Sequence, residues 1–576
     1  MSPSAANLNI ARHLLAMAAA QPDTAALKIP RGRTAAGEID YLTLTFAELA
    51  SEVAAWQSRL TVAGVRPGDR TLVMVRPGLP LIAAVFALFT LGAVPVVIDP
   101  GMGLKHFLGC VVHARPRVLV GIPFARLLSR LFRRTFSSVK IRVAAANSLT
   151  ARLASRQAQK PKLETIAPCS ATELAAILFT SGSTGAPKGV CYEHGHFDAQ
   201  VRLIRETYDI RPGEIDLPLL PIFALFNPAL GMTTIIPELD PRRPATLNAA
   251  KIVQAIRQEN VTNSFGSPTL WRKIGDHCLA RGITLPTLRR VLCAGAPVPA
   301  RLWEISPEIL PRGQLHSPYG ATEALPVTSI SADEIKMVRG PGACVGRPVS
   351  EIEIKIIVPV EGAIESMADM RELPRGEIGE IVVRGPVVTN SYDALPAATA
   401  LAKIKTTGGD APAVKAAAGQ FETPNSNPSQ NPNSKTAAGT AGIWHRMGDC
   451  GYLDLDGRLW FCGRKAERIE TVHGVLYTEP CEQIFRGHPA VARCALVGLG
   501  PRGLQEPALA IELTASTPVS DRAGLARELR EIAARNAATA RIEKIFFHPG
   551  FPVDVRHNAK IHRLTLAKWA TSARSW

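Results

Sequence analysis

The sequence lacks paired cysteines of the kind that bind structural zinc. Its ten cysteines are scattered, and none stands in a Cys-x2-Cys pair, the spacing typical of zinc sites. The scatter also argues against a disulfide framework, so a reduced, cytoplasmic compartment fits. Residues 1–12 lack a basic segment followed by an apolar core, and no secretory signal is therefore expected.

Long apolar runs are scarce as well. One run, over residues 79–98, reaches membrane-spanning length. Pro80, Gly92 and Pro95 interrupt it. We therefore predict a buried helix up to Leu91 and a strand over residues 94–98, with a membrane span as the alternative.

Acidic residues are absent from residues 101–163, which contain thirteen Lys and Arg and so carry most of the net charge of +17. Within this segment three arginines follow helical spacing and four apolar residues fall largely on another face: Arg126, Arg130, Arg133 and Leu127, Leu128, Leu131, Phe132. Such a helix can contact an anionic membrane or an acidic partner through residues 105–162, or it can simply be solvated. No nucleic-acid recognition module accompanies the charge, so nucleic acid is not an expected partner.

The common phosphate loop, Gly-x4-Gly-Lys-Ser/Thr, is also missing. A different string follows an apolar run over residues 174–179 that predicts a buried parallel strand. The string is rich in glycine and hydroxyl groups: Thr180, Ser181, Gly182, Ser183, Thr184, Gly185, Ala186, Pro187, Lys188, Gly189. Its glycines let backbone N–H groups crowd an anion, its hydroxyls add donors, and its lysine supplies a charge. We predict a polyphosphate site here, with a Ser/Gly turn between core elements as the alternative.

This string resembles the phosphate loop of the adenylate-forming superfamily, which includes acyl-CoA synthetases and luciferases. The resemblance implies ATP, Mg2+ and a carboxylic acid as substrate. It also implies an α/β fold, in which a large N-terminal domain of stacked α/β layers precedes a small mobile α+β C-terminal domain. A length of 576 residues agrees with more than one domain. We place the ATP- and acyl-binding domain at residues 1–463 and the lid domain at 464–576.

Two further segments are similar to nucleotide-binding parts of that superfamily. Residues 291–297 predict a strand that ends in an adenine-contacting turn at Gly295, Ala296 and Pro297. The second segment is Tyr319-Gly320-Ala321-Thr322-Glu323. A tyrosine ring can stack on a purine, a threonine hydroxyl can contact the α-phosphate, and a carboxylate can hold Mg2+. A surface turn with an incidental glutamate is the alternative.

The C-terminal third resembles the remaining parts of the nucleotide site. Asp449 follows a glycine and can accept both ribose hydroxyls. Arg464 resembles the arginine that reaches ribose or phosphate. At Ala466 relatives carry an Asp or Lys hinge. Lys560 resembles the lysine that closes the site, although its spacing from Pro552 is longer by two. The resemblance thus implies catalysis by Lys188, Thr322, Glu323 and Lys560, with Glu323 as the magnesium ligand.

The acyl side of the site is predicted from apolar composition. Residues 217–231 are apolar and aromatic, and they resemble the family's acyl-pocket segment, where Ala224 replaces a frequent histidine. A wall without that polar group favours a hydrocarbon chain. Residues 264–268 form a second predicted wall. Residues 406–438 are rich in Ala, Pro, Asn, Ser, Thr and Gly and predict a disordered insertion.

Three local predictions concern chain geometry. Thr45-Phe46-Ala47-Glu48 is a capping box that starts a helix running to about residue 62. An Asp-Gly pair within residues 453–459 predicts a hairpin turn. A helix is expected near residues 525–537, with Gly524 as its N-cap.

Residues 222–232, 463–466 and 556–560 most resemble the olefin β-lactone synthetases of bacterial long-chain olefin biosynthesis. This resemblance implies ATP-dependent adenylation of a long-chain 2-alkyl-3-hydroxy fatty acid. The 3-hydroxyl would then attack within the molecule to form a β-lactone, with AMP and pyrophosphate released. Other enzymes of olefin biosynthesis, a β-lactone decarboxylase and a reductase, are candidate partners. The protein is expected to be cytoplasmic, with peripheral membrane contact left open.

Two alternatives to that function remain. The first is a long-chain fatty acyl-CoA or acyl-AMP ligase of the same fold. The second is a non-catalytic scaffold that uses the basic segment. No base for lactone closure can be assigned; His194 and His196 are candidates, with packed or surface histidines as the alternative.

Overall fold

The computed structural model describes residues 7–145, 163, 165–180, 186–240, 243, 246–406, 442–514, 521–553 and 561–576. Several sequence predictions therefore lie partly or wholly outside the described residues, among them the basic segment over residues 105–162, which is described only as far as residue 145. Of the predicted disordered insertion only Thr406 is described. Residues 181–185 of the predicted phosphate loop and Lys560 are outside as well.

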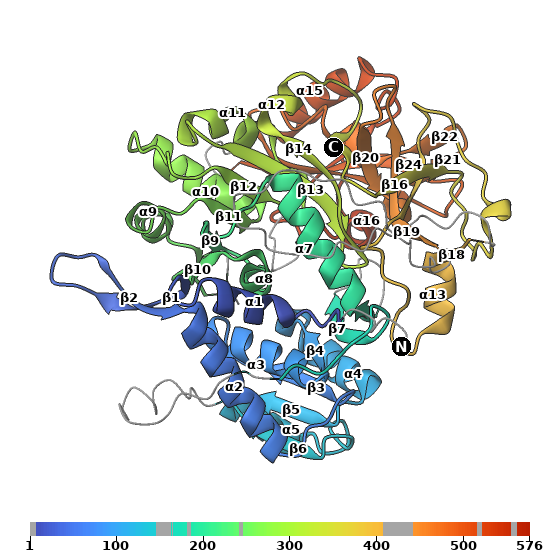
Figure 1. Cartoon of the computed structure of the whole chain (residues 1–576). Helices are drawn as coiled ribbons and strands as arrows, with labels where there is room; N and C mark the ends of the chain where they lie inside the picture. Colours follow the sequence, from blue (N-terminus) through green and yellow to red (C-terminus); the bar gives the residue numbers. More distant parts are fainter. Residues whose placement is uncertain are drawn as a thin grey trace, which may run out of the picture.

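A six-stranded sheet forms the lower part of the molecule in Figure 1. In spatial order its strands are β6 (Ile141–Ala144), β5 (Val118–Gly121), β3 (Arg70–Met74), β4 (Val94–Ile98), β7 (Leu174–Thr180) and β8 (Lys188–Glu193). Neighbouring strands are parallel, except β7 and β8, which pair antiparallel. Strand β7 is thus a parallel strand on its β4 side, as predicted, and half of a hairpin on the other.

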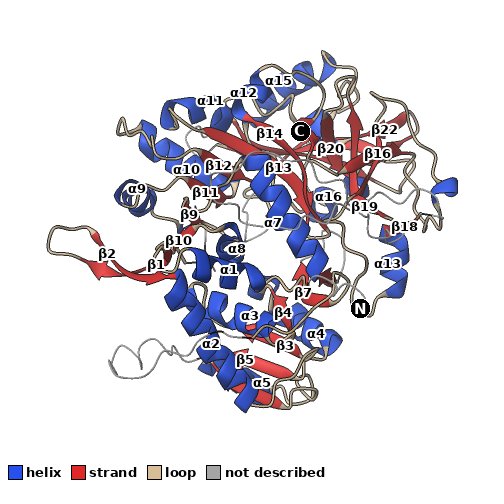
Figure 2. Ribbon diagram, in the orientation of Figure 1, coloured by secondary structure: helices blue, strands red, loops and turns tan. Residues whose placement is uncertain are grey.

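Helices cover both faces of this sheet, as the ribbon in Figure 2 shows. One face packs on α2 (Phe46–Val62) and α3 (Leu79–Thr90), the other on α4 (Leu104–Ala114) and α5 (Pro123–Leu131). Side chains alternate along a strand, so Leu72 joins the core under α4 and α5 while Val73 joins that under α2 and α3. Burial on both faces explains why these strands are continuous apolar runs.

The longest apolar run divides into helix α3 and strand β4, as predicted. No helix in the described part of the chain is long and apolar enough to cross a membrane.

A second, 14-stranded sheet spans the upper part of the molecule. In spatial order its strands are β16 (Glu353–Ile357), β17 (Gly379–Arg384), β19 (Ile443–Leu453), β20 (Leu459–Arg464), β15 (Ala343–Pro348), β14 (Ala324–Ser331), β13 (Gln314–Ala321), β12 (Arg290–Cys293), β11 (Asn263–Gly266), β9 (Ile215–Pro218), β10 (Thr233–Ile235), β1 (Ala25–Arg33) and β2 (Ile39–Thr45), with β18 (Lys403–Lys405) paired to β19.

Eight helices of the described chain accompany this sheet: α1 (Arg12–Ala20), α7 (His194–Tyr208), α8 (Asn227–Leu230), α9 (Ala249–Gln258), α10 (Pro268–Leu279), α11 (Ala300–Ile309), α12 (Ala332–Lys336) and α13 (Pro396–Ala402). Helix α7 contacts β8 of the smaller sheet and β14 of the larger one. It crosses the centre of the view in Figure 1 and joins the two sheets.

The chain beyond Arg464 has its own small sheets. Its elements are β21 (Ile469–Thr471), β22 (Gly474–Leu476), α14 (Thr478–Glu482), β23 (Val491–Leu499), β24 (Glu506–Leu513), α15 (Arg522–Ala534), β25 (Lys544–Phe547) and α16 (Arg563–Ala570). Strands β23, β24 and β25 form one sheet, and β21 and β22 form another. Two apolar clusters consist entirely of residues after Arg464. The exact domain boundary stays a prediction.

Two of the local predictions are confirmed and one is wrong. The capping box is present: Glu48 N donates to Thr45 Oγ1 at 3.2 Å, and Thr45 N donates to Glu48 Oε2 at 3.1 Å. Strands β19 and β20 form the predicted hairpin. Gly524, however, is not an N-cap. Helix α15 begins at Arg522 and is capped by Asp521, whose carboxylate accepts from Gly524 N at 2.7 Å. A carboxylate supplies the acceptor that a helix start needs, which glycine cannot.

Candidate active site

A cavity of about 2800 Å3 lies where the two large sheets and the C-terminal part of the chain meet. Ile98 and Phe179, near the carboxyl ends of β4 and β7, line it. In open α/β sheets this edge is where ligands bind. From the other side, residues of β13, β19 and β20 face the same space, together with Ile561 from the C-terminal part. The cavity is therefore built from segments distant in sequence.

The predicted phosphate loop meets this cavity at its C-terminal end, where Ala186, Pro187 and Lys188 line it. Thr180 is the last residue of β7, Lys188 is the first of β8, and the two are paired across the hairpin. The Lys188 ammonium lies 4.8 Å from the centre of the Tyr392 ring, a cation–π contact. No carboxylate of the described residues lies within ion-pair distance of Lys188. An anion that enters the cavity can therefore pair with it.

Thr322 and Glu323 form the turn between β13 and β14, and both line the cavity. Their backbone is held from both sides: the Tyr192 hydroxyl donates to Thr322 O, and Thr389 N donates to Glu323 O at 2.9 Å. The Tyr392 hydroxyl donates to Glu323 Oε1 at 2.7 Å. Among the described residues no basic side chain forms an ion pair with this carboxylate. Its charge is thus available to a cation.

Tyr319, Asp449 and Arg464 form a connected group at the cavity wall. The Tyr319 hydroxyl donates to Asp449 Oδ2 at 2.7 Å, and Arg464 Nη1 lies 2.8 Å from Asp449 Oδ1. Asp449 and Arg464 stand opposite each other on β19 and β20. The Asp449 charge raises the pKa of Arg464, and burial followed by the same charge raises the pKa of Tyr319. A carboxylate oxygen can accept more than one hydrogen bond, so Asp449 can also receive hydroxyl donors.

The predicted adenine turn follows strand β12. Gly295, Ala296 and Pro297 all line the cavity. Gly295 has a φ of 95°, in the left-handed region where glycine is favoured. Gly320 is constrained differently, since a Cβ there would lie 2.6 Å from Ala324 O. Gly295 thus allows the turn after β12, and Gly320 allows the close approach of β13 to the start of β14.

An apolar wall closes the opposite side. Residues 217–231 fold as the end of β9, the 3-10 helix η2 (Pro221–Leu225) and the short helix α8, because prolines interrupt any longer helix. Phe223 of η2 stacks on Phe265 with ring centres 3.6 Å apart. Ala224 is buried and lines the cavity, as do Phe265 and Pro268 of the second predicted wall.

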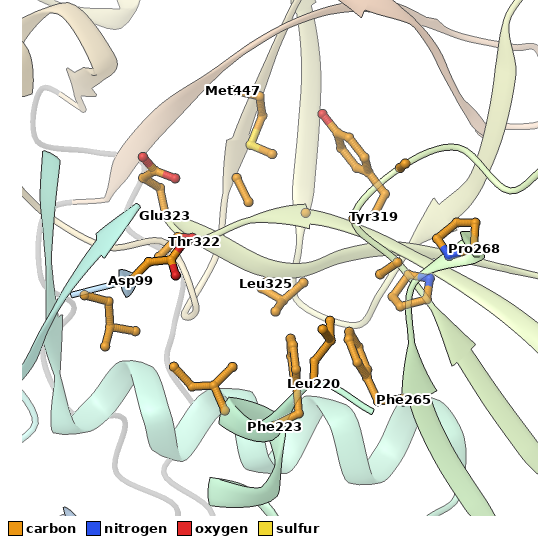
Figure 3. A pocket seen from close by; sticks show the side chains of 18 of the residues that line it. Asp99, Leu220, Phe223, Phe265, Pro268, Tyr319, Thr322, Glu323, Leu325 and Met447 are labelled. Carbon is orange, nitrogen blue, oxygen red and sulfur yellow. The ribbon is translucent and has the colours of Figure 1, made fainter. Parts of the chain in front are cut away.

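Figure 3 shows these two sides together. Glu323, Met447 and Tyr319 lie above Leu325 in this view, and Phe223, Leu220 and Phe265 lie below it. The polar residues predicted for nucleotide and metal are thus separated by a few side chains from an aromatic and aliphatic pocket. Such an arrangement suits a ligand with an anionic head and a hydrocarbon tail.

Three residues near the site were not predicted from sequence. Tyr392 links Lys188 and Glu323, and His445 lines the cavity. Lys403 is buried, with Nζ 3.3 Å from Thr389 Oγ1. Burial lowers the pKa of Lys403 to about 7, against the opposing effect of the Glu323 charge. None of the three stands in a distinctive sequence pattern; only their long-range contacts identify them.

The two histidines considered as bases are packed within the fold. His194 accepts from Ile10 N at 3.3 Å, and His196 accepts from Glu193 N at 3.0 Å. Burial lowers the pKa of each to about 4. This agrees with the packed alternative.

The chain leaves the cavity through the 3-10 helix η5 (Lys465–Glu467), which contains Ala466. Arg464, Lys465 and Ala466 line the cavity. Lys465 Nζ pairs with Glu380 Oε2 at 3.0 Å, and the same carboxylate pairs with Arg446. Lys560 lies outside the described residues.

The donor set fits ATP with Mg2+. Lys188 offers a cation to phosphate, Glu323 offers a carboxylate oxygen of the kind Mg2+ prefers, and Asp449 offers acceptors for hydroxyl groups. Within the described residues neither Lys188 nor Glu323 is neutralised by a charged partner of its own.

Comparisons with known proteins agree with this geometry. Residues 16–393 match the family described as AMP-binding enzyme. Two proteins named olefin beta-lactone synthetase, from Xanthomonas campestris pv. campestris and Stenotrophomonas maltophilia, are each 41% identical, over 98% of this chain and 98% of theirs. A solved O-succinylbenzoate coenzyme A synthetase from Bacillus subtilis, in complex with ATP and magnesium ion, superposes with a TM-score of 0.71 at 22% identity, covering 96% of this chain and 98% of that one. The likeness confirms the predicted α/β fold class.

Proposed function

The chain belongs to the AMP-binding enzyme family, as its motifs predicted, and from this we propose that it is an ATP-dependent ligase that activates a 3-hydroxy fatty acid and closes it to a β-lactone. The observation that supports closure to a β-lactone is the 41% identity to two olefin beta-lactone synthetases over almost the whole length of each. The apolar wall around Phe223 and Phe265 supports a long hydrocarbon substrate, a 2-alkyl-3-hydroxy fatty acid.

In the first step a carboxylate oxygen of the acid attacks the α-phosphorus of ATP, and pyrophosphate leaves. The protein's task is to hold two anions together and to neutralise developing charge. Lys188 pairs with the phosphate tail and the Thr322 hydroxyl contacts the α-phosphate, while Asp449 and Arg464 hold the ribose. Glu323 would hold Mg2+, which would supply further positive charge to the phosphates. Lys560 joins the carboxylate and the α-phosphate.

In the second step the substrate's own 3-hydroxyl oxygen attacks the acyl carbon. A C–O bond forms, the bond from the acyl carbon to AMP breaks, and the hydroxyl proton is released to water. Because nucleophile and acyl carbon belong to one molecule, roughly 7–11 kcal/mol of pre-organisation is available, from which ring strain subtracts. No coenzyme A takes part, in keeping with Ala466 at the hinge position.

The cellular location and the partner enzymes are proposed from the same similarity to olefin beta-lactone synthetases. The enzyme works in the cytoplasm. The enzymes that supply the hydroxy acid and consume the lactone, a reductase and a β-lactone decarboxylase, are its partners.

A product assay without coenzyme A tests the function. With ATP, Mg2+ and a long-chain 2-alkyl-3-hydroxy acid, we expect one AMP for each β-lactone detected by mass spectrometry. The acid without a 3-hydroxyl is the matched control, because it can be adenylated but cannot cyclise. A strict requirement for coenzyme A would identify an acyl-CoA ligase instead. AMP-bound acid without lactone would identify an acyl-AMP ligase.

The scaffold alternative has its own test. The Lys188→Ala and Lys560→Ala variants should each lose about 10²–10³ in rate, as expected for loss of a charge-stabilising donor. Lys336→Ala, which removes an exposed lysine paired with Asp333, is the control and should keep the wild-type rate. Unaltered activity in the double variant would support a non-catalytic role.

A further inference from the structure

Helix α5 presents an unusual row of exposed apolar side chains. Phe124, Leu127 and Leu131 are 62%, 54% and 70% exposed. Their spacing of three and four residues places them on one face of the helix. The sequence placed Leu128 on that face too, but Leu128 turns inward and is 8% exposed. The three exposed side chains therefore contribute little to the core, and the stability of the fold does not explain why they are apolar.

Arginines flank that row and surround a small surface pocket. The pocket, of about 550 Å3, is lined by Ser129, Arg130, Arg133, Phe136, Ser137, Val139 and Arg142. Arg142 is anchored, since its Nε donates to Ser129 Oγ at 3.0 Å and its Nη1 donates to Val139 O at 3.2 Å.

None of the three arginines has a carboxylate partner among the residues that the structure describes, and residues 101–163 contain no Asp or Glu. Guanidinium groups gathered without a counter-charge suit a phosphate group.

The apolar row begins at the large cavity. Phe124, in the first turn of α5, lines that cavity, and so do Lys105 and His106 at the start of α4. Both helices begin at the carboxyl ends of the parallel strands β4 and β5, the edge at which the cavity opens. The row thus runs from the rim of the cavity along α5, at the lower edge of the molecule in Figure 1.

We infer that α5 and its arginine pocket dock the enzyme on an anionic phospholipid bilayer. Leu127 and Leu131 enter the boundary between headgroups and acyl chains, and Arg130, Arg133 and Arg142 pair with lipid phosphates. This surface combines apolar and basic side chains and has no acidic residue among them. An acidic protein could be bound by the basic side chains alone, whereas an anionic lipid bilayer also accommodates the apolar ones. The surface therefore matches a bilayer better. Docking on the bilayer is independent of the proposed reaction. A further step, in which the fatty acid enters the cavity from the bilayer past Phe124, rests on the proposed function.

Vesicle sedimentation of the full-length protein tests this surface. We expect binding to vesicles of phosphatidylcholine mixed with phosphatidylglycerol, little binding to phosphatidylcholine alone, and loss of binding at high salt. The R130E/R133E variant should bind the mixed vesicles about tenfold or more weakly, and L127S/L131S should also bind more weakly. R535E/R541E makes the same charge change at two exposed residues elsewhere and should bind as the wild type does.

Several outcomes would overturn the inference. They are wild-type binding by R130E/R133E, equal binding to both kinds of vesicle, no vesicle binding at all, or association with an acidic protein that R130E/R133E loses while vesicles are ignored. Displacement by millimolar inorganic phosphate alone would indicate a free-phosphate site instead. Activity on a water-soluble short-chain 3-hydroxy acid, without vesicles, should be unchanged in all variants and shows that they are folded. Vesicle binding does not depend on the lactone assay, so either proposal can fail without the other.

Discussion

At the scale of single residues, Tyr392 contacts both Lys188 and Glu323, the two charged residues of the proposed nucleotide site. Its hydroxyl donates to Glu323 at 2.7 Å while its ring lies 4.8 Å from the Lys188 ammonium. A magnesium-binding carboxylate needs such a neighbour to fix its orientation, because the oxygen that accepts from tyrosine sets the direction of the other one. We therefore propose that Tyr392 is a positioning residue, which acts through Glu323.

Removing the Tyr392 hydroxyl should change how the rate of adenylation depends on the Mg2+ concentration. For Tyr392→Phe we expect the Mg2+ concentration for half-maximal adenylation to rise about tenfold or more, and the rate at saturating Mg2+ to recover in part. Tyr452→Phe, which removes a hydroxyl from a tyrosine stacked on Trp460, is the control. A Tyr392→Phe enzyme that is slow with unchanged Mg2+ dependence would point to a structural role only. Pyrophosphate release measured against Mg2+ distinguishes the two.

The sequence predicts site residues when they stand in one short segment, and it fails when they meet through the fold. Thr322 and Glu323 follow Tyr319 closely, so their common turn could be foreseen. Tyr392 and Lys403 reach the same place from strands and loops about 70 and 80 residues further along the chain, and a lone tyrosine or lysine carries no local signal. Long-range pairing brings them near Glu323: Tyr392 bridges to Val190 of β8, and Lys403 lies on β18, paired with His445 of β19.

At the scale of elements, strand β9 carries a buried carboxylate beside the acyl wall. Asp216 accepts from Asn227 Nδ2 at 2.8 Å, yet burial raises its pKa from 3.8 to about 7. Between about pH 4 and pH 7 the folded protein therefore holds a proton that the unfolded chain has lost. The free energy of unfolding contributed by Asp216 falls as pH rises through this window and is lowest above pH 7.

Asp216→Asn should remove the loss of stability that ionisation of the buried Asp216 carboxyl causes as pH rises. The amide keeps an acceptor for Asn227, so the geometry is preserved. We expect the stability of the variant relative to wild type to improve by roughly 2–3 kcal/mol between pH 5 and pH 8. His194 and His196 titrate in both proteins and cancel in the comparison. Chemical denaturation at the two pH values measures the difference, and a constant difference would show that Asp216 is ionised throughout.

Helix α15 gives a second prediction at this scale, on the cap that the sequence misplaced. Asp521→Ala removes the acceptor for Gly524 N and should cost about 1 kcal/mol in stability. Glu531→Ala removes an exposed carboxylate from the last turn of the same helix, away from the cap, and should change stability little. Thermal unfolding of both variants measures the effect. Equal shifts would mean that charge, rather than the cap, is what matters.

Helix starts and turns could be predicted from the sequence where the residues that determine them are close together in the chain. The capping box before α2 and the Asp-Gly turn between β19 and β20 each lie within a few residues, and both are present. At α15 the sequence predicted Gly524 as the N-cap, whereas Asp521, three residues earlier, accepts the capping hydrogen bond. The pairing of β1 with β10 and of β15 with β20, which completes the large sheet, had no local signal, because these paired strands come from distant segments.

At the scale of the whole molecule, two regions have separate cores. Leu529 belongs to a cluster made only of residues after Arg464, whereas Leu270 belongs to a cluster within residues 39–332. Contacts between the regions include the ion pairs of Lys465 with Glu380 and of Arg468 with Glu361, beside the packing of Tyr477 on an apolar cluster of the preceding region. Polar contacts of this kind couple two bodies more weakly than a shared apolar core does. This is the arrangement that a lid domain beginning at Arg464 would need.

Leucine truncation in each core tests whether the two regions unfold separately. Leu529 and Leu270 are 0% and 1% exposed, so Leu529→Ala and Leu270→Ala should each cost roughly 2–5 kcal/mol. In scanning calorimetry of the full chain we expect two transitions, with Leu529→Ala lowering only one and Leu270→Ala only the other. A non-hydrolysable acyl-AMP analogue should draw the two transitions together, because a ligand that touches both regions stabilises them jointly. If both variants shift every transition equally, the chain unfolds as one unit and residues 464–576 are not a separate domain.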